Sequence, residues 1–285
     1  MKIQITGING YLGTLISGQL KSNGHEVEGI ERAQIYGSIE NLAEQVAGCD
    51  VIINLAGANI LKRWTKSAKE EIYQSRIETT TNLVKAIRSL DTEKQPTVFI
   101  SGSAIGIYKN GMIHDESSTD FDEGFLGKVV KDWETALNDL PSEIRTVIFR
   151  IAPVLGKNSR MMKNLKLPFL LGLGGKIASG KQAFPFIHET DLVRAFHSAV
   201  ENNWKGTFNL VAPEQISNID FTRTFAHLVH RPAFLPVPAF ALRIIFGEAA
   251  GMLVDSPQVI PKALQEQGFQ FEFPDIHSTL QNILN

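Results

Sequence analysis

The sequence contains a single cysteine, Cys49, among its 285 residues. One thiol cannot form an intramolecular disulfide, and it excludes the cysteine-rich class of metal site. The 7 histidines are scattered without the spacing of a metal site, so we expect no bound metal. The first residues run directly into a glycine motif and leave no room for a secretory leader. Together with the lone thiol, this predicts a cytoplasmic protein.

Runs of positive charge and long apolar runs are also missing. The formal net charge is -2, and no run of lysine and arginine exceeds two residues. This argues against binding to nucleic acid or to an acidic membrane surface. The most apolar late stretch, 238–254, contains Arg243 and Glu248 and is too short for a membrane span. We interpret it as a buried or interface helix, and a homo-oligomer built through it is one hypothesis.

Hydrophobic residues make up 43% of the chain, which is enough for a sizeable core. Apolar strands alternate with helices through the first half of the sequence. This pattern predicts an α/β fold of the Rossmann type, in which a doubly wound parallel sheet is covered by helices on both faces. We expect strands at 3–5, 25–31, 51–55, 98–100, 146–150 and 208–211. We expect helices at 14–23, 39–46, 125–137, 191–201 and 218–230, and a long helix that opens on a capping box at Ser67.

The second half of the sequence is less regular. Residues 170–180 are rich in glycine and are expected to form a loop over a cleft, and prolines at 232, 236 and 238 mark a linker into a helical region. We expect a dinucleotide-binding domain over 1–155, to which 189–211 returns. A smaller, mostly helical C-terminal lobe is expected from 156–188 and 212–285, and it would hold the substrate.

The strongest motif is a glycine turn between the first strand and the first helix. Gly7, Gly10 and Gly13 are spaced GxxGxxG. The first glycine allows a tight turn, the second lets the backbone approach a pyrophosphate, and the third lets the helix pack close to the sheet. Free N–H groups at the helix start, including those of Tyr11 and Leu12, would face the phosphates. The context of strand, turn and helix therefore predicts a dinucleotide site.

The second strand ends in Glu31 and Arg32, 18 and 19 residues after the last glycine of the turn. An acid at this position would bind the ribose 2′-hydroxyl of NAD, whereas an arginine would accept the 2′-phosphate of NADP. The sequence offers both. Because the guanidinium fork suits phosphate, we favour NADP(H) as the cofactor and leave NAD open.

Further segments complete a pattern that extends over nearly the whole chain. They are Asn54–Gly57, Ser101–Gly106, Asp132–Glu134, Arg150–Gly156, Leu171–Lys176, Phe186–Leu192 and Leu235–Arg243. With the glycine turn, this order of segments resembles the extended short-chain dehydrogenase/reductases. Within them it is similar to atypical, epimerase-like proteins that carry a C-terminal domain of unknown function.

The resemblance implies a fold like that of nucleotide-sugar epimerases and reductases, with NADP(H) as cofactor. It places Leu55, Ala56 and Gly57 along the adenosine and ribose. It also places Ser101 at the serine strand end and Pro153 on the strand that closes over the nicotinamide. The substrate cleft would include Lys181 and His188. Related epimerases often have asparagine where Pro153 stands, and proline offers no donor there.

The superfamily's chemistry needs a tyrosine and a lysine four residues apart on one helix face. The lysine lowers the tyrosine pKa, and the tyrosine exchanges a proton with the substrate oxygen, which a serine orients. Ser103 is present in the right context. None of the 4 tyrosines has a lysine four residues later. Aligning Glu134 with the family's glutamate places Leu126 and Val130 at the two catalytic positions, and neither transfers a proton.

Three residues are candidates to replace the missing pair: Tyr108, Lys131 and Lys128, for which the alternative is a solvated helix face. Tyr108 lies five residues after Ser103, and Lys131 lies one residue from the usual lysine position. One residue is about 100° around a helix, so direct replacement by Lys131 is doubtful. The alternatives are a hydrogen-bonded aromatic in the cleft wall for Tyr108 and a solvated face for Lys131. For His188 the alternative is simple packing, with Asp191 as a helix cap.

Two hypotheses of function remain. The chain is an NADP(H)-dependent oxidoreductase or epimerase with a non-standard site, acting on an unidentified small polar substrate. Alternatively, it is a non-catalytic NADP(H)-responsive binding or regulatory protein. The missing tyrosine and lysine favour the second hypothesis, whereas Ser103 and the glycine-rich loop favour the first.

Overall fold

Six parallel strands form the central sheet of the computed structural model, which describes residues 1–285. In spatial order they are β2 (Glu26–Ile30), β1 (Lys2–Thr6), β3 (Val51–Asn54), β4 (Val98–Ala104), β6 (Arg145–Ile151) and β9 (Gly206–Leu210). All four residues of β3 are buried, as expected for a strand that is covered on both faces. The predicted Rossmann-type α/β class is confirmed.

The strand order reverses at β1, which pairs with β2 on one side and with β3 on the other. Thr6, the last residue of β1, lies opposite Ile30 and Asn54. In open parallel sheets, ligands bind beyond the carboxyl ends of the strands at such a switch point. The glycine turn leaves the sheet at this edge.

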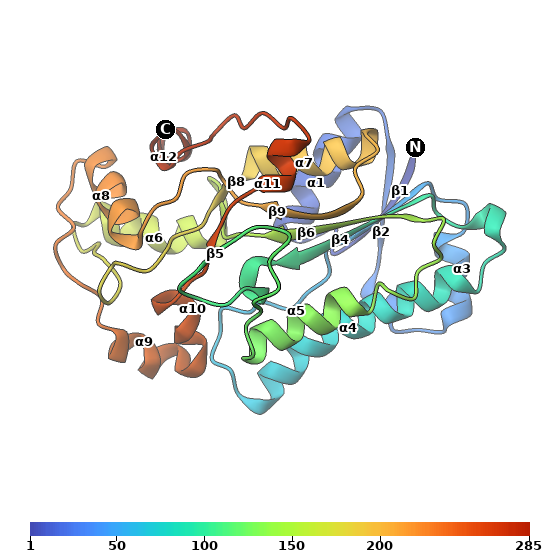
Figure 1. The fold of residues 1–285 in the computed structure, drawn as a ribbon, viewed down its shortest axis with the longest axis horizontal. Helices are drawn as coiled ribbons and strands as arrows, with labels where there is room; N and C mark the ends of the chain where they lie inside the picture. The colour runs from blue at the N-terminus through green and yellow to red at the C-terminus, as the bar shows by residue number, and fades with distance from the viewer.

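Helices cover both faces of the sheet, as Figure 1 shows. One face carries α1 (Tyr11–Ser22), α7 (Glu189–Glu201) and α11 (Lys262–Glu266). The other carries α2 (Arg32–Ile35), α3 (Ile39–Val46), α4 (Lys66–Arg88) and α5 (Phe125–Thr135). Each face has its own core of isoleucine, valine, leucine and phenylalanine side chains. Their burial, at about 25 cal/mol per Å² of apolar surface, drives the layered packing.

Three helix starts differ from the sequence-based expectation, and one of them is that of α7, which begins at Glu189 and not at residue 191. Helix α1 begins at Tyr11, three residues earlier than predicted. Helix α4 is capped by Thr65, whose hydroxyl accepts a hydrogen bond from the N–H of Ala68 at 3.2 Å. Ser67 therefore lies in the first turn and is not the cap. Both Thr65 and Ser67 are residues that favour a cap, so the local pattern alone did not separate them.

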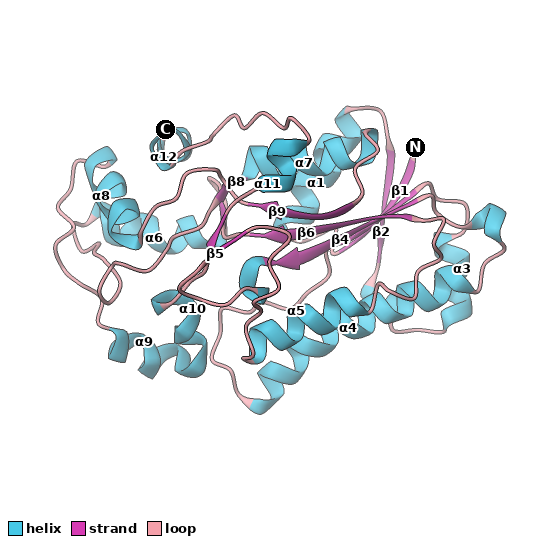
Figure 2. Cartoon of the chain, viewed as in Figure 1, coloured by secondary structure: helices cyan, strands magenta, loops and turns pink.

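A second group of helices packs beside the sheet, on the left of Figure 2. Helices α6 (Arg160–Leu170), α8 (Asn218–Leu228) and α12 (Ile276–Leu284) share a third core, which includes Met162, Phe225 and Leu280. Two short parallel ladders accompany it, β7 (Val154–Leu155) with β8 (Ile187–His188), and β5 (Ile113–His114) with β10 (Gln258–Val259). The remaining elements are the 3-10 turns η1 (Thr92–Lys94), η2 (Ile105–Ile107) and η3 (Gly247–Ala250), and helices α9 (Ala239–Phe246) and α10 (Gly251–Val254).

The apolar stretch 238–254 does not form one helix. It is divided into α9, η3 and α10, and the break falls at Gly247, whose φ is 60°. No helix of the structure combines the length and the apolar character that crossing a membrane requires.

Candidate functional site

The glycine turn has the backbone geometry that its sequence predicts. Gly7 has a φ of 71°, a conformation that side chains disfavour. A Cβ on Gly13 would lie 2.2 Å from the carbonyl oxygen of Gly7, so only glycine permits this approach of α1 to the turn. Gly10 is the N-cap residue and provides no side-chain hydrogen bond. The first N–H groups of α1, beginning at Tyr11, are therefore free to bind an anion.

A chain of buried hydrogen bonds fixes the neighbouring loop. The Thr6 hydroxyl donates to Asn54 Oδ1 at 2.7 Å and accepts from the N–H groups of Leu55 and Ala56, both at 3.1 Å. The Asn54 amide in turn donates to the hydroxyl of Thr80 on α4 at 2.8 Å. These hydrogen bonds fix the loop that the resemblance places along the ribose. Sequence analysis did not predict them.

Arg76 on α4 is a second residue that sequence analysis missed. Its guanidinium donates to the carbonyl oxygens of Ala58 and Ile72, both at 3.1 Å, and lies 5.4 Å from the ring centre of Trp133. A Cβ on Gly57 would come within 2.9 Å of it. Burial lowers the pKa of Arg76 to about 10, and the residue has no carboxylate partner. It therefore places an unpaired positive charge directly under the loop.

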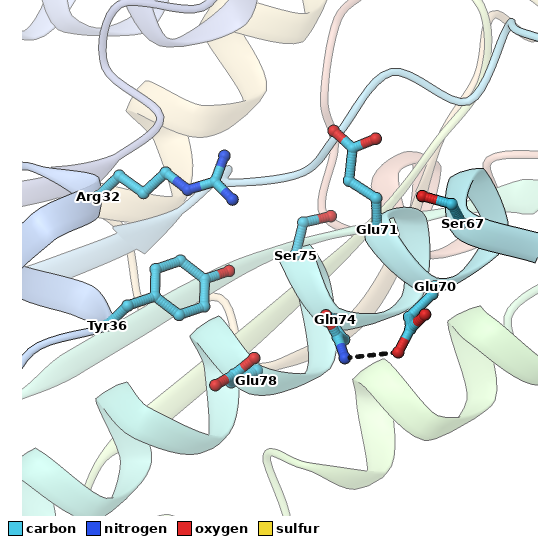
Figure 3. A pocket seen from close by; sticks show the side chains of 8 residues that line it. All are labelled: Arg32, Tyr36, Ser67, Glu70, Glu71, Gln74, Ser75 and Glu78. Atoms are coloured by element: carbon cyan, nitrogen blue, oxygen red, sulfur yellow. Dashed lines mark hydrogen bonds between the residues drawn. The ribbon is translucent and has the colours of Figure 1, made fainter.

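Arg32 points into a hollow of about 190 Å³ between the end of β2 and α4 (Figure 3). Its guanidinium carbon lies 5.4 Å from the ring centre of Tyr36. The other lining residues are Ser67, Glu70, Glu71, Gln74, Ser75 and Glu78. A hydrogen bond from Lys62, with a smaller effect of Arg32, holds the pKa of Glu71 below its usual range. Glu31 is exposed at the N-cap of α2, and its N–H donates to Gln34 at 2.7 Å.

Ser103 lies inside β4 and is 4% exposed. Its hydroxyl donates to Glu134 Oε1 at 2.5 Å. Arg150 holds the same carboxylate through two hydrogen bonds, of 2.9 Å from Nε and 2.7 Å from Nη2. An ion pair of this bidentate kind fixes both partners strongly. The hydroxyl of Ser103 is therefore tied to a rigid group behind the strand.

Tyr108 extends the same network. Its hydroxyl donates to Asn209 Oδ1 and accepts from Arg150, both at 2.8 Å. The side chain is 2% exposed, and burial raises the pKa of Tyr108. A proton donor needs a path to its substrate, and this phenol has none in the structure. The alternative of a hydrogen-bonded, buried aromatic describes its position.

The helix positions of the missing pair hold apolar side chains. Leu126 faces Gly106, since its Cβ lies 3.8 Å from where a Cβ of that glycine would be. Val130 is 3% exposed in a core cluster with Tyr108. Lys131 is exposed on α5, with no ion-pair partner, as the solvated-face alternative predicts. Lys128 of the same helix forms an ion pair with Asp132 at 2.6 Å.

Two residues proposed for the cofactor lie within β4 and just after β6. Ser101 is 1% exposed within β4, and its hydroxyl donates to the carbonyl of Gly102 at 2.9 Å. Pro153 is exposed between β6 and β7, and its carbonyl accepts from the N–H of Ile187 at 3.1 Å. Only Pro153 presents a surface to an incoming ligand in this arrangement.

The predicted cleft residues Lys181 and His188 differ in exposure. Lys181 is exposed in the loop after the glycine-rich segment. His188 is 1% exposed, and its ring lies 3.8 Å from that of Phe273. His188 Nδ1 accepts from the N–H of Thr190 at 3.1 Å, so His188 is the cap of α7. Both ring nitrogen atoms of His188 have protein partners, as the packing alternative expects, and its place in a substrate cleft stays a prediction.

Asp191, which the alternative names as the cap, is not the cap of α7. Its carboxylate is fully buried and accepts from the N–H groups of Glu272 at 2.8 Å and Phe273 at 2.9 Å. Arg194 pairs with it at 3.0 Å. The buried charge thus fixes the segment that leads to α12. The sequence could not indicate this role because the partner backbone lies about eighty residues away.

A second hollow, of about 540 Å³, flanks the glycine turn on the side of α6. Two cations, Arg160 and Lys163, line it from the first turn of α6, opposite Gly10 and Tyr11. The hydroxyl of Tyr11 donates to Glu189 at the start of α7. The turn is thereby connected to the second half of the chain, beside an arginine and a lysine that sequence analysis did not single out.

Comparison with known proteins agrees with this geometry. Residues 3–210 match the NAD dependent epimerase/dehydratase family, and residues 237–283 match a domain of unknown function, DUF1731. The chain is 36% identical to mouse epimerase family protein SDR39U1, over 100% of both chains.

Solved structures show the same relationship. Human SDR39U1, solved with NADPH, is 35% identical over 99% of both chains, with a TM-score of 0.92. A nucleoside-diphosphate sugar epimerase from Corynebacterium glutamicum is 27% identical, with a TM-score of 0.79, over 100% of this chain and 58% of that protein. The chain therefore belongs to the NAD dependent epimerase/dehydratase family.

Proposed function

We propose that this chain binds NADP(H) beyond the carboxyl ends of β1 and β3. The observation that carries the proposal is the uncapped start of α1 after Gly7, Gly10 and Gly13, where a Cβ on Gly13 would collide with backbone. Free N–H groups and the helix dipole favour a pyrophosphate at this point. The human relative that was solved with NADPH supports the choice of cofactor.

The surrounding residues fit the rest of the cofactor. Leu55 and Ala56, held by Thr6, would line the adenosine ribose, with the charge of Arg76 beneath. Arg32 would accept the 2′-phosphate in its hollow, near the serine hydroxyls of α4. NADPH supplies a hydride when bound, so what remains for the chain is to orient the nicotinamide and to provide a proton.

What the chain lacks is a side chain that could transfer the proton as the superfamily's tyrosine does. Leu126 and Val130 occupy the positions of the superfamily's tyrosine and lysine, while Tyr108 is buried and Ser103 donates to Glu134. We therefore propose an NADP(H)-responsive binding protein as the primary function, in which the cofactor is held without the proton transfer of the superfamily. A cytoplasmic location and a homo-oligomer stay predictions.

A second candidate is an oxidoreductase or epimerase that acts on a small polar substrate of the nucleotide-sugar class. The cations Arg160 and Lys163 beside the glycine turn favour it, because they suit the phosphates of such a substrate. The relative from Corynebacterium glutamicum bears the name of a nucleoside-diphosphate sugar epimerase. In this case 156–188 and 212–285 would be the substrate lobe, beside a dinucleotide-binding domain of 1–155.

Titration of the purified protein with NADPH and NADH, followed by cofactor fluorescence, tests the proposal. Wild-type protein is expected to prefer NADPH. Arg32→Ala should remove most of this preference, since a charge-assisted hydrogen bond contributes about 1.5–3 kcal/mol. Glu31→Gln is the matched control and should leave NADPH affinity unchanged. Equal weakening of both cofactors by Arg32→Ala, or no binding by wild type, would contradict the proposal.

Turnover separates the two functions. Bound NADPH is mixed with a panel of carbonyl compounds and nucleotide sugars, and loss of its absorbance is measured. A binding protein leaves NADPH intact with every compound. Oxidation that Ser103→Ala abolishes and Arg160→Ala weakens would instead establish the enzyme.

A further inference from the structure

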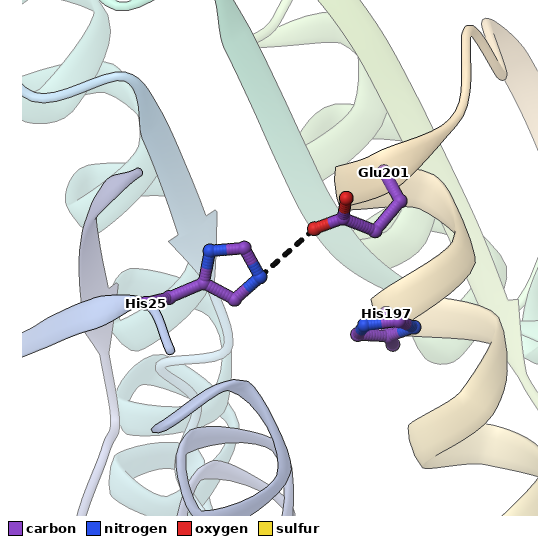
Figure 4. Close-up of side chains that lie close together, drawn as sticks. All are labelled: His25, His197 and Glu201. Carbon is purple, nitrogen blue, oxygen red and sulfur yellow. Dashed lines mark ion pairs between the residues drawn. The ribbon is translucent and has the colours of Figure 1, made fainter. Parts of the chain in front are cut away.

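Three side chains with metal-binding atoms meet at the edge of the sheet opposite the glycine turn. His25 lies directly before β2, and His197 and Glu201 lie one turn apart near the end of α7. One ring nitrogen of each histidine and one carboxylate oxygen all lie within 4.8 Å of one another. Figure 4 shows His25 and Glu201 pointing toward each other, with His197 one turn away on the same helix.

The interactions of His25 leave a nitrogen without a hydrogen bond. Its Nε2 lies 2.9 Å from Glu201 Oε1, close enough for an ion pair. The angle does not make a hydrogen bond, so this buried nitrogen has no hydrogen-bond partner in the protein. Leaving a buried polar atom unsatisfied is costly. A ligand that accepts the lone pair of this nitrogen would remove the cost.

We propose that His25, His197 and Glu201 bind a divalent transition metal of the zinc type. Two imidazoles and one carboxylate are a donor set that zinc uses, with a fourth position left for water. Ligand atoms around tetrahedral zinc are about 3.3 Å apart, as bonds of about 2.0–2.1 Å require. The three donor atoms lie within 4.8 Å of one another in the structure, so the side chains must move closer together to bind an ion. Glu201 is 40% exposed, which gives the ion a way in.

The position of the site determines its role. It joins the turn between α1 and β2 to the end of α7, two helices that pack against each other. A metal there would lock this pair in the folded state. The site lies at the amino ends of the strands, so it does not depend on dinucleotide binding at their carboxyl ends.

The proposal departs from the expectation that the histidines form no metal site. His197 and Glu201 are four residues apart, which places them on one helix face. This four-residue spacing is the feature of the sequence that could have indicated two of the three ligands. The third ligand, His25, joins them only when β2 and α7 fold onto the same part of the sheet.

The test uses Zn²⁺ and Co²⁺ with the full chain. Zinc is expected to raise the melting temperature, and Co²⁺ is expected to give the visible spectrum of a tetrahedral site that Zn²⁺ displaces. His25→Ala, His197→Ala and Glu201→Gln should each weaken the metal affinity by at least about tenfold, because loss of an outer-shell contact alone costs 10- to 100-fold.

His277→Ala is the control, because His277 is an exposed histidine on α12, away from the cluster. Circular dichroism of each variant establishes that it is folded, and this readout is independent of the cofactor. The proposal is overturned if wild type gives no cobalt spectrum, or if His277→Ala loses as much affinity as His197→Ala.

Discussion

Because the side chain of Gly13 is only a hydrogen atom, helix α1 can lie close to the turn before it. A methyl group there would lie 2.2 Å from the Gly7 oxygen and 2.7 Å from the Cα of Ile8. Both contacts are with backbone, so a side chain cannot relieve them by rotating. The residue is therefore required both for the stability of the turn and for its shape.

We expect Gly13→Ala to destabilise the protein by about 1–3 kcal/mol, the usual cost of overpacking, and to reduce NADPH affinity because the N–H groups of α1 move. Urea unfolding and cofactor titration measure the two effects. Gly18→Ala is the control in the same helix, since nothing lies within 4 Å of its Cβ position. It should stabilise by up to about 1 kcal/mol, and the prediction fails if both variants behave alike.

The sequence predicted the glycine turn because all of its determinants are local. The sequence did not predict the hydrogen bonds that fix the site, because they join residues that are distant in the chain. Thr6 contacts Asn54, and Ser103 contacts Glu134. The sequence placed Ser103 in the right strand but could not indicate that its hydroxyl is already engaged.

At the scale of elements, α7 begins with a histidine as its cap. Burial lowers the pKa of His188 from its ordinary value of 6.5, against the weaker opposing effect of Glu189 and Asp191. The unfolded chain therefore binds a proton at this site more readily than the folded chain does. Stability then falls as pH decreases below about 6.5, and the loss continues down to the lowered pKa of the folded state.

Replacing His188 by asparagine, which also caps helices well, should remove this contribution. We expect the free energy of unfolding of wild type to drop more between pH 7 and about pH 5.5 than that of His188→Asn. Chemical denaturation at each pH measures the difference. A matched loss in both proteins would show that His188 does not titrate with folding.

Strand positions were the most predictable part of the fold. Residues 51–54 are apolar until Asn54 and form β3 as expected, because continuous burial requires such a run. Helix starts were less predictable, since α1 begins at Tyr11 without a side-chain cap. An anion bound at that end would satisfy the N–H groups that a cap otherwise binds.

At the scale of the whole molecule, the separate core clusters lead us to predict that parts of the chain unfold separately. Leu280 on α12 is fully buried against α8 and α6. Leu280→Ala should cost about 2–5 kcal/mol, since it removes buried volume that neighbours only partly refill. Because the glycine turn belongs to other cores, NADPH affinity should persist at moderate denaturant. The two-domain division stays a prediction that this experiment tests.

Ile244→Ala is the control, because Ile244 is 68% exposed on α9. It should change stability by less than about 0.5 kcal/mol. Unfolding followed by tryptophan fluorescence and by NADPH binding gives the two readouts. Coincident loss of both signals in Leu280→Ala would mean that the molecule is one cooperative unit.

The third core also has a consequence for synthesis of the protein. Its members come from Leu155 to Phe225 and then from Ile276 to Ile283. On the ribosome, the first set emerges well before α12, the helix that covers it. At about 5–20 residues per second, the interval of some fifty residues lasts several seconds. During this time the phenylalanine side chains of α8 are not yet covered by α12. A nascent chain that exposes them is a substrate for chaperones that bind apolar surface.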